Sequence, residues 1–224
     1  MTGPSEFLRV TEIFHSIQGE SSWAGLPCTF IRLTGCPLRC VWCDTEYAFH
    51  GGDRMTLDEI LREVQSIGTE LVEITGGEPL VHRGAYTLAR RLLDAGYTVL
   101  VETSGAMDIE PLHDNVHVIM DLKCPGSGEA SKNLWSNLEH LDGRDELKFV
   151  IRDREDYEWA RNVIREHGLD RRLRKGTLKA ILFSPVWGEQ DRLDLAQWIL
   201  EDRLPVRFQL QLHKLVWGAD VAGV

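Results

Sequence analysis

Apolar runs alternate with amphipathic segments along most of this chain, and this alternation limits the folds that it can form. The runs are apolar on both faces, which is typical of strands in a covered parallel sheet. Between them apolar residues recur at helical spacing, and Thr56 and Glu59 have the spacing of a capping box. We expect strands at residues 29–33, 71–75, 97–103, 116–122, 146–151, 178–183 and 206–212, and helices at 56–67, 84–95, 153–168 and near 190–202.

This order of elements predicts βαβ units in an α/β fold. Right-handed crossovers curl such a sheet in one direction. Seven strands are too few for a complete eightfold barrel, which typically takes about 250 residues. We therefore predict an incomplete (partial) β/α barrel with a mostly parallel, curved sheet, whose functional groups collect at the carboxyl ends of the strands.

The chain has the length and apolar content of a single domain, since 43% of its 224 residues are hydrophobic. We divide residues 1–224 into an N-terminal extension (1–27), the partial barrel (28–217) and a short tail (218–224). Cys28 and Cys124 stand apart from the other cysteines and are expected to be buried small hydrophobes.

The formal net charge of −10 argues against a protein that covers nucleic-acid phosphates and favours a small-molecule substrate. No segment approaches the roughly 20 apolar residues that cross a bilayer. The N-terminus also lacks a basic region followed by an apolar one, so we expect a cytoplasmic protein without membrane contact.

Cys36, Cys40 and Cys43 form a C-x3-C-x2-C loop, which in a reducing compartment indicates a metal site. A [4Fe–4S] cluster held by three thiolates leaves one iron open for a small molecule. The alternative is a structural zinc ion with a distant fourth ligand such as His15 or His50. Spacing alone favours iron–sulfur and leaves zinc open.

Two motifs resemble the radical S-adenosylmethionine (SAM) superfamily: GCPLRCVWCDT at residues 35–45 and TGGEP at residues 75–79. The resemblance implies that SAM chelates the open iron and that the GGE backbone holds its amino group. It also implies that an electron passed through the cluster cleaves SAM to a 5′-deoxyadenosyl radical, which removes a hydrogen atom from the substrate.

Further motifs along nearly the whole chain resemble the 7-carboxy-7-deazaguanine synthase family: SIQGE, FIRL, CDT, VETSG, DLKCPGSGE, ELKFVI, ILFSPVWG and QLHKLVWG. That likeness implies a lyase of queuosine-type 7-deazapurine biosynthesis. Its substrate would be 6-carboxy-5,6,7,8-tetrahydropterin and its product 7-carboxy-7-deazaguanine, with loss of ammonia. The enzyme would depend on magnesium and would regenerate SAM in each turnover.

The family resemblance also implies a role for particular residues. Thr45 would bind Mg²⁺, and the N-terminal extension would bind substrate. The residues implied to contact SAM are Trp42, Cys43, Asp44, Gly76, Gly77, Glu78, Gly105, Lys148, Ser184, Pro185, Val186 and Trp187. Those implied to contact substrate are Ile17, Gln18, Gly19, Glu20, Arg32, Thr103 and His213.

Each of these assignments has a structural alternative. A guanidinium fork suits a planar carboxylate or a pterin edge, but Arg32 can also form an ordinary ion pair. Thr45 taken alone would be a helix cap, and TSG at 103–105 a strand-to-helix turn. We expect His213 and Lys214 to end the last strand, where a histidine is as often structural as functional.

Two other functions remain possible on the sequence: an activating enzyme for a glycyl-radical protein, and a non-catalytic iron–sulfur or zinc module. SIQGE and the HK pair at 213–214 argue against the first. A partial barrel leaves sheet edges uncovered, so we expect a homodimer. An electron donor such as flavodoxin would be needed, and we expect no substrate contact from the tail.

Overall fold

The computed structural model describes residues 7–219 and 221–224, so residues 1–6 of the predicted extension and Asp220 of the predicted tail lie outside it. Within the described residues one sheet has the strand order β3-β1-β2-β4-β5-β6-β7-β8-β9. The strands are β1 (Phe7–Ile17), β2 (Pro27–Leu33), β3 (Asp53–Thr56), β4 (Leu71–Gly76), β5 (Thr98–Thr103), β6 (His117–Asp121), β7 (Glu146–Ile151), β8 (Ala180–Pro185) and β9 (Arg207–Phe208).

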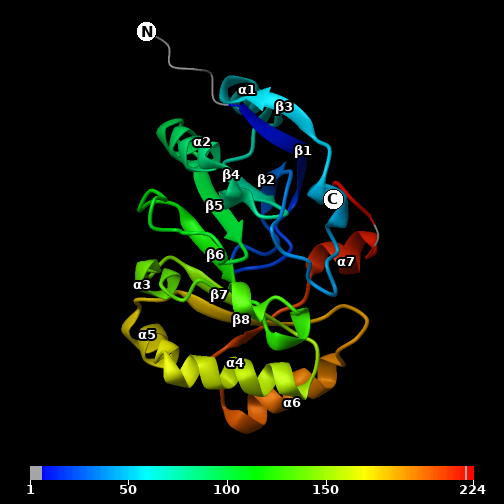
Figure 1. Ribbon diagram of the computed structural model, residues 1–224, viewed down its shortest axis with the longest axis vertical. Coiled ribbons are helices and arrows are strands. Elements are labelled where there is room, and N and C mark those ends of the chain that lie inside the picture. The colour runs from blue at the N-terminus through cyan, green and yellow to red at the C-terminus, as the bar shows by residue number, and fades with distance from the viewer. Residues whose placement is uncertain (1–6, 220) are drawn as a thin grey trace.

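Helices cover the outside of this curved sheet, with α1 and α2 beside its upper strands and α4 and α6 along its lower edge (Figure 1). The α-helices are α1 (Leu57–Ile67), α2 (Arg83–Asp94), α3 (Asn137–His140), α4 (Arg154–Glu166), α5 (Leu169–Lys175), α6 (Arg192–Asp202) and α7 (Leu212–Trp217). Short 3-10 helices are η1 (Glu46–Phe49), η2 (Pro79–Val81), η3 (Pro125–Ser127) and η4 (Ala130–Lys132). None of the described helices is both long and apolar enough to span a membrane.

The predicted partial barrel is confirmed, and the seven expected strands are the seven that pair in parallel, from β2 to β9. Strands β1 and β3 were not predicted. They pair antiparallel, β1 with β2 and β3 with β1. Much of β1 is only partly buried, so it lacks the doubly apolar run that marks the buried strands.

Local signals placed the helix ends correctly. The Thr56 hydroxyl accepts the Glu59 N–H and the Glu59 carboxylate accepts the Thr56 N–H, which completes the capping box at the start of α1. Asp153 caps α4 through the N–H of Asp156. Gly168 follows that helix with φ +62°, a left-handed conformation that glycine adopts without strain.

The expected strand at 206–212 is wrong beyond Phe208. Residues 209–211 leave the sheet, and Leu212 begins α7. The side chain of Gln209 accepts the Ser21 N–H and donates to the Ser21 carbonyl, and the Leu212 N–H donates to the Gly19 carbonyl. These bonds direct the chain to the turn that follows β1, so His213 and Lys214 lie on a short helix and not at the end of a strand.

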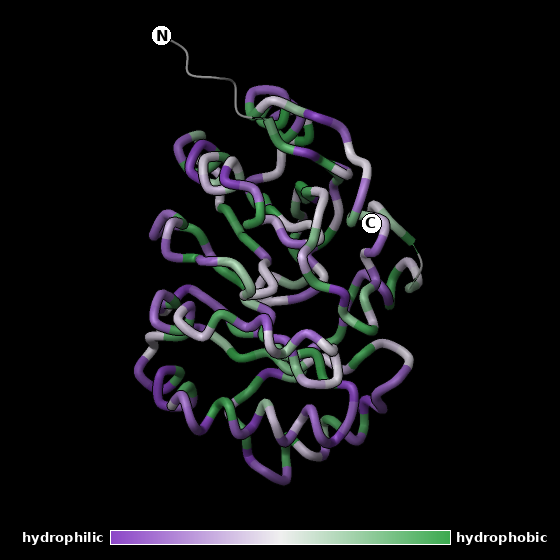
Figure 2. Tube along the Cα trace, viewed as in Figure 1, coloured by the Kyte–Doolittle hydropathy of each residue, from purple (hydrophilic) through white to green (hydrophobic). Residues whose placement is uncertain are grey.

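The sheet separates two apolar cores, and hydrophobic segments follow the strands while hydrophilic ones lie on the outer helices (Figure 2). The larger core packs between the sheet and the helices. A small one lies on the inner face and consists of Cys28, Phe30, Leu71, Leu100 and Ile119. Side chains two residues apart on a strand share a face. The residues two positions beyond these apolar residues therefore also face the inside of the barrel, which we call the lumen.

Candidate active site

A cavity of about 760 Å³ opens at the carboxyl ends of the parallel strands. Most of the side chains predicted from the sequence line it: Ile17, Gln18, Gly19, Glu20, Arg32, Cys36, Cys40, Trp42, Cys43, Asp44, Thr45, Gly76, Gly77, Thr103, Lys148, Val186, Trp187 and His213. The fold therefore brings together residues that are up to 196 positions apart in the chain.

Four predicted residues are not part of the cavity wall: Glu78, Gly105, Ser184 and Pro185. Glu78 is fully buried, and its carboxylate accepts hydrogen bonds from the Leu80 N–H, the Thr103 hydroxyl and the Ser104 N–H. Glu78 therefore positions the end of β5, and its backbone N–H is also engaged, by the Gly35 carbonyl at 2.9 Å. Gly105 has φ +70°, and a Cβ there would lie 2.9 Å from Cγ of Met120.

Hydrogen bonds to the segment that follows β6 fix the cysteine loop in place. The Val41 N–H donates to the Ser127 carbonyl at 3.1 Å, and the Arg39 N–H donates to the Glu129 carboxylate at 2.8 Å. Cys36, Cys40 and Cys43 are free thiols and half-buried. Burial raises the pKa of each thiol.

The donor set fits a cluster better than a structural zinc ion. All three thiols line the cavity, whereas His15 and His50, the residues considered as a fourth zinc ligand, do not. Three thiolates suit a [4Fe–4S] cluster with one open iron, while a structural zinc ion is fully enclosed by four protein ligands.

Gly76 and Gly77 allow the chain after β4 to lie against the end of β2. A Cβ on Gly76 would overlap the Leu33 carbonyl oxygen, and one on Gly77 would lie 2.6 Å from the Gly35 carbonyl oxygen and 2.7 Å from Cβ of Cys36. This close approach needs residues without side chains. It leaves the Gly76–Gly77 backbone directly beside the cysteine loop.

Lys148 carries a buried charge at the centre of the lumen, since its side chain is 6% exposed. Its ammonium contacts the carboxylates of Glu20 and Glu102 and lies 4.0 Å from Asp121. Burial alone would lower the pKa of this ammonium, but Glu102, Glu20 and Asp121 raise it well above its ordinary value. Lys148 therefore stays charged and ties the predicted substrate residue Glu20 to the barrel.

Residues 18–23 form a turn between β1 and β2 that enters the lumen, and we call it the lumen turn. Besides Glu20, it is held by Ser22, whose N–H donates to the buried Glu146 carboxylate at 2.9 Å. Gln211 donates to the other oxygen of Glu20 at 2.7 Å. The lumen turn is thus bonded to β7 and to the segment before α7, and it bridges the two ends of the partial barrel.

Arg32 forms the ion pair that the sequence left as an alternative, but only with part of its guanidinium. Its Nε donates to Glu12 at 2.7 Å, and the Tyr47 hydroxyl donates to the same oxygen. The guanidinium also lies over the rings of Phe14 and Tyr47. Among the described residues nothing accepts a hydrogen bond from its two Nη groups. Arg32 lines the cavity, so these two groups remain available for a ligand there.

Thr45 does not make the capping bond that the sequence favours. It precedes η1, yet its side chain accepts no hydrogen bond from that helix and its hydroxyl donates to Asp44 at 2.9 Å. Burial opposes ionisation of Asp44, but the Lys214 ammonium, 2.5 Å from Oδ2, together with Thr45 lowers the pKa of Asp44 well below its ordinary value. The Thr45 oxygen therefore lies beside a carboxylate and keeps free lone pairs.

His213 packs against Gly19. A Cβ on Gly19 would overlap Nδ1 of His213, so glycine is required where α7 meets the lumen turn. Burial lowers the pKa of His213. The structure thus places this histidine on the cavity wall although the strand on which we expected it ends at Phe208.

Several residues of the cavity wall were not identified from the sequence. Lys123 pairs with Asp121 at 2.9 Å and lies close enough to Cys40 for the thiol to affect the pKa of Lys123. The polar residues of the wall to which the sequence assigned no role include Glu73, Glu102, Ser104, Asp121, Lys123 and Gln211. All of these except Glu73 lie within the motifs VETSG, DLKCPGSGE and QLHKLVWG, so the motifs contained them without showing what they do.

The C-terminal tail, to which the sequence assigned no contact, reaches the cavity. Val221, Ala222, Gly223 and Val224 all line the cavity. Gly218 follows α7 with φ +103°, which lets the chain turn back toward the cavity.

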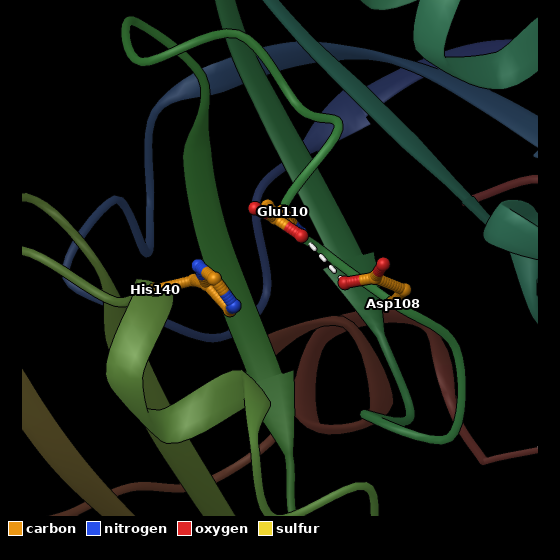
Figure 3. Close-up of side chains that lie close together, drawn as sticks. All are labelled: Asp108, Glu110 and His140. Carbon is orange, nitrogen blue, oxygen red and sulfur yellow. Dashed lines mark hydrogen bonds between the residues drawn. The ribbon is translucent and has the colours of Figure 1, made fainter.

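One further group of possible metal ligands lies at the opposite end of the barrel, near the start of β6. The ligand atoms of Asp108, Glu110 and His140 all lie within 4.8 Å of one another, and all three residues are exposed (Figure 3). Asp108 already accepts the Glu110 N–H at 2.9 Å. We assign no ligand to this exposed group.

Comparison with known proteins shows what this chain is similar to. A model described as the Radical SAM superfamily matches residues 30–199. A 7-carboxy-7-deazaguanine synthase from Koribacter versatilis is 46% identical over 231 residues, which is 97% of this chain and 100% of the relative. Another, from Chlorobaculum tepidum, is 44% identical over 97% of both chains. The crystal structure of QueE from Escherichia coli shares the fold, with a TM-score of 0.73 at 24% identity over 92% of this chain and 95% of that chain.

Burial raises the pKa of the Cys40 thiol to about 11. Because the thiolate is the reactive form, alkylation of Cys40 by iodoacetamide in metal-free protein should be slow at neutral pH and rise about tenfold per pH unit toward pH 11. Peptide mass spectrometry measures this rate. In urea-unfolded protein the rate should level off near pH 8.5, because the pKa of an exposed cysteine thiol is about 8.5. The same plateau in folded protein would contradict a buried thiol.

Proposed function

Because this chain belongs to the radical SAM superfamily, and within it to the 7-carboxy-7-deazaguanine synthases, we propose that it converts 6-carboxy-5,6,7,8-tetrahydropterin to 7-carboxy-7-deazaguanine with loss of ammonia. Its family is a lyase family of queuosine biosynthesis that uses a [4Fe–4S] cluster and SAM. The observation that carries the proposal is the single cavity, whose wall contains both the cysteine loop and the lumen turn.

Cys36, Cys40 and Cys43 would hold the cluster, because they are the thiols of the cavity. The bound cluster and SAM would supply the radical that removes a hydrogen atom from the substrate. Lys123 is the cation beside these thiols and would balance the charge of the thiolates. The Gly76–Gly77 backbone lies against the same loop and would hold the amino group of SAM.

The remaining SAM contacts of the proposal belong to two further segments of the chain. Trp42 and Asp44 flank the third cysteine on the cavity wall, and Val186 and Trp187 follow β8 on the other side. Gly105, Ser184 and Pro185 would contribute through backbone atoms or by supporting their neighbours, since they do not line the cavity.

Substrate would bind between the lumen turn and Arg32. Arg32 offers two free Nη groups in the planar arrangement that suits a carboxylate. Glu20, Thr103 and His213 line the same space and supply acceptors and donors for a pterin edge. Gln18 would position the lumen turn, because its side-chain amide is bonded to Glu73 and to the Glu20 N–H, and its backbone groups pair with Leu26 and Gly25.

Magnesium would bind at Thr45. Mg²⁺ takes few protein ligands and is completed by water and substrate oxygens, so one hydroxyl on a cavity wall is a suitable ligand. Arg32 and Thr45 line the same cavity, and a substrate carboxylate that reaches both would explain a dependence on the metal.

We also propose a homodimer and a flavodoxin-like electron donor. Leu215, Val216 and Trp217 of α7 are exposed apolar side chains, and β3 leaves one edge of the sheet unpaired. Val41 is 68% exposed between the second and third cysteines, so the loop that would hold the cluster reaches the surface where a donor can approach.

The activity is tested by anaerobic reconstitution of the protein with iron and sulfide, followed by reductant, SAM, Mg²⁺ and the carboxytetrahydropterin. We expect many molecules of 7-carboxy-7-deazaguanine per SAM, measured by liquid chromatography and mass spectrometry, and none with Cys40→Ala. SAM cleavage without deazapurine would refute the proposed substrate. Stoichiometric SAM consumption that requires a partner protein would instead indicate a glycyl-radical activating enzyme.

Thr45→Val keeps the shape of the side chain and removes the hydroxyl. We expect the Mg²⁺ concentration for half-maximal rate to rise about tenfold, which corresponds to about 1.4 kcal/mol for the lost ligand. Thr45→Ser restores a hydroxyl and should stay near the wild-type value. An equal Mg²⁺ dependence in the valine variant would remove Thr45 from the metal site.

Light scattering coupled to size exclusion tests the oligomeric state. The wild-type protein should elute with twice the mass of one chain. Replacement of Val216 and Trp217 by Lys and Glu should shift the equilibrium to monomer if α7 contributes to the interface. A wild-type monomer over the whole accessible concentration range would refute the dimer.

A further inference from the structure

Two glutamates in the lumen have no role in the chemistry described above. Glu73 on β4 is 1% exposed, and Glu102 on β5 lies beside it on the same face of the sheet. Both belong to the cavity wall. Glu73 lies outside the motifs found in the sequence, and Glu102 lies in VETSG without an assigned role.

The charges around this pair are unevenly distributed. The ion pairs of Lys148 within the described residues are to Glu20, Glu102 and Asp121, and none is to Glu73. Glu73 instead lies beside Glu102 on the same face of the neighbouring strand, and it accepts a hydrogen bond from the Gln18 amide, whose Nε2 lies 2.6 Å from Oε2. The ammonium thus stabilises a negative charge on Glu102 alone.

Two carboxyl groups that lie beside each other in the lumen do not both ionise, because like charges repel strongly away from water. Since Lys148 stabilises the charge on Glu102, the proton belongs on Glu73. One oxygen of Glu73 accepts from Gln18, and the protonated oxygen can then donate to Glu102. Burial and the neighbouring Glu102 both raise the pKa of Glu73 well above its ordinary value, which agrees with this assignment.

The consequence reaches the lumen turn. Gln18 donates to Glu73 with its nitrogen and accepts the Glu20 N–H with its oxygen at 2.5 Å. The carboxylate of Glu20 contacts Lys148, and Lys148 contacts Glu102. The bonds therefore close a ring that runs from Gln18 through Glu73, Glu102, Lys148 and Glu20 back to Gln18.

We propose that Glu73 is a positioning residue that acts as a neutral carboxylic acid, holding the Gln18 amide and, through it, the part of the lumen turn that binds substrate. This inference rests on the proposed function for the identity of that substrate. An ionised Glu73 would lose its bond to Glu102, repel that carboxylate and compete for Lys148. The turn would then lose the support that keeps Glu20 in place.

The test uses two substitutions. Glu73→Gln preserves the pattern, because an amide oxygen accepts from Gln18 and an amide nitrogen donates to Glu102. Glu73→Met has a similar length and makes neither bond. Glu146→Gln is the matched control, since Glu146 is a buried glutamate of the same sheet that binds Ser22 and contacts Lys179.

Infrared spectroscopy of the metal-free protein reports the proton directly. At about pH 8 the wild type should show the carbonyl band of a protonated carboxylic acid, shifted in D₂O, and Glu73→Gln should lose it while Glu146→Gln keeps it. Asp145, whose pKa burial raises to about 6, is ionised under these conditions. A band that persists in Glu73→Gln overturns the proposal.

Steady-state kinetics of reconstituted enzyme report the positioning. We expect KM for the pterin to stay within about threefold of wild type in Glu73→Gln and to rise about tenfold or more in Glu73→Met, with SAM affinity unchanged in both. Equal rises in KM for both variants, or a matching loss of SAM affinity, overturn the proposal. If Glu73→Met does not fold, the kinetics of Glu73→Gln and the infrared band still test whether Glu73 is a neutral positioning residue.

The two proposals fail in different ways. If the wild-type enzyme forms no deazapurine, the proposed function is refuted, while the infrared band continues to test the protonation of Glu73. If the wild type turns over normally and lacks the band, the inference about Glu73 is refuted and the function stands.

Discussion

The buried ammonium of Lys148 is the interaction on which the site depends. It joins the lumen turn, through Glu20, to β5 through Glu102 and approaches β6 at Asp121. A lone charge in this lumen would be strongly unfavourable, and the surrounding carboxylates make it stable. Because these partners come from separate parts of the chain, the pairing exists only when the sheet has curved around the turn.

This pairing makes the lumen turn a structural element as well as a binding surface. The turn also bonds to Glu146 at the start of β7 and to Gln209 and Gln211 near the C-terminus. An open barrel with two free edges is thereby bridged on its inner side, and α7 is held where His213 meets Gly19. Removal of one bond in this set would affect the positions of several predicted substrate contacts at once.

The strands and the cysteine loop could be predicted because their signals are local. Doubly apolar runs identified the seven parallel strands, and the carboxyl-edge rule placed the cavity correctly. The capping role of Thr45 failed, since its hydroxyl donates to Asp44 and its oxygen accepts no N–H of η1. The strand at 206–212 ends early: the Gln209 N–H still donates to Phe183 of β8, but the Gln209 side chain bonds Ser21 of the lumen turn, and α7 begins at Leu212.

The sequence by itself determined the fold class, the cysteine loop and about half of the cavity wall, since periodicity and motifs depend on neighbours along the chain. Only the tertiary structure decided which polar groups pair: Gln18 with Glu73, Lys148 with Glu20, Lys214 with Asp44, and Glu78 with the end of β5. The partners in these contacts lie 25 to 170 residues apart. Burial then sets the energy of each pair, because a charge or amide removed from water must find its partner within the fold.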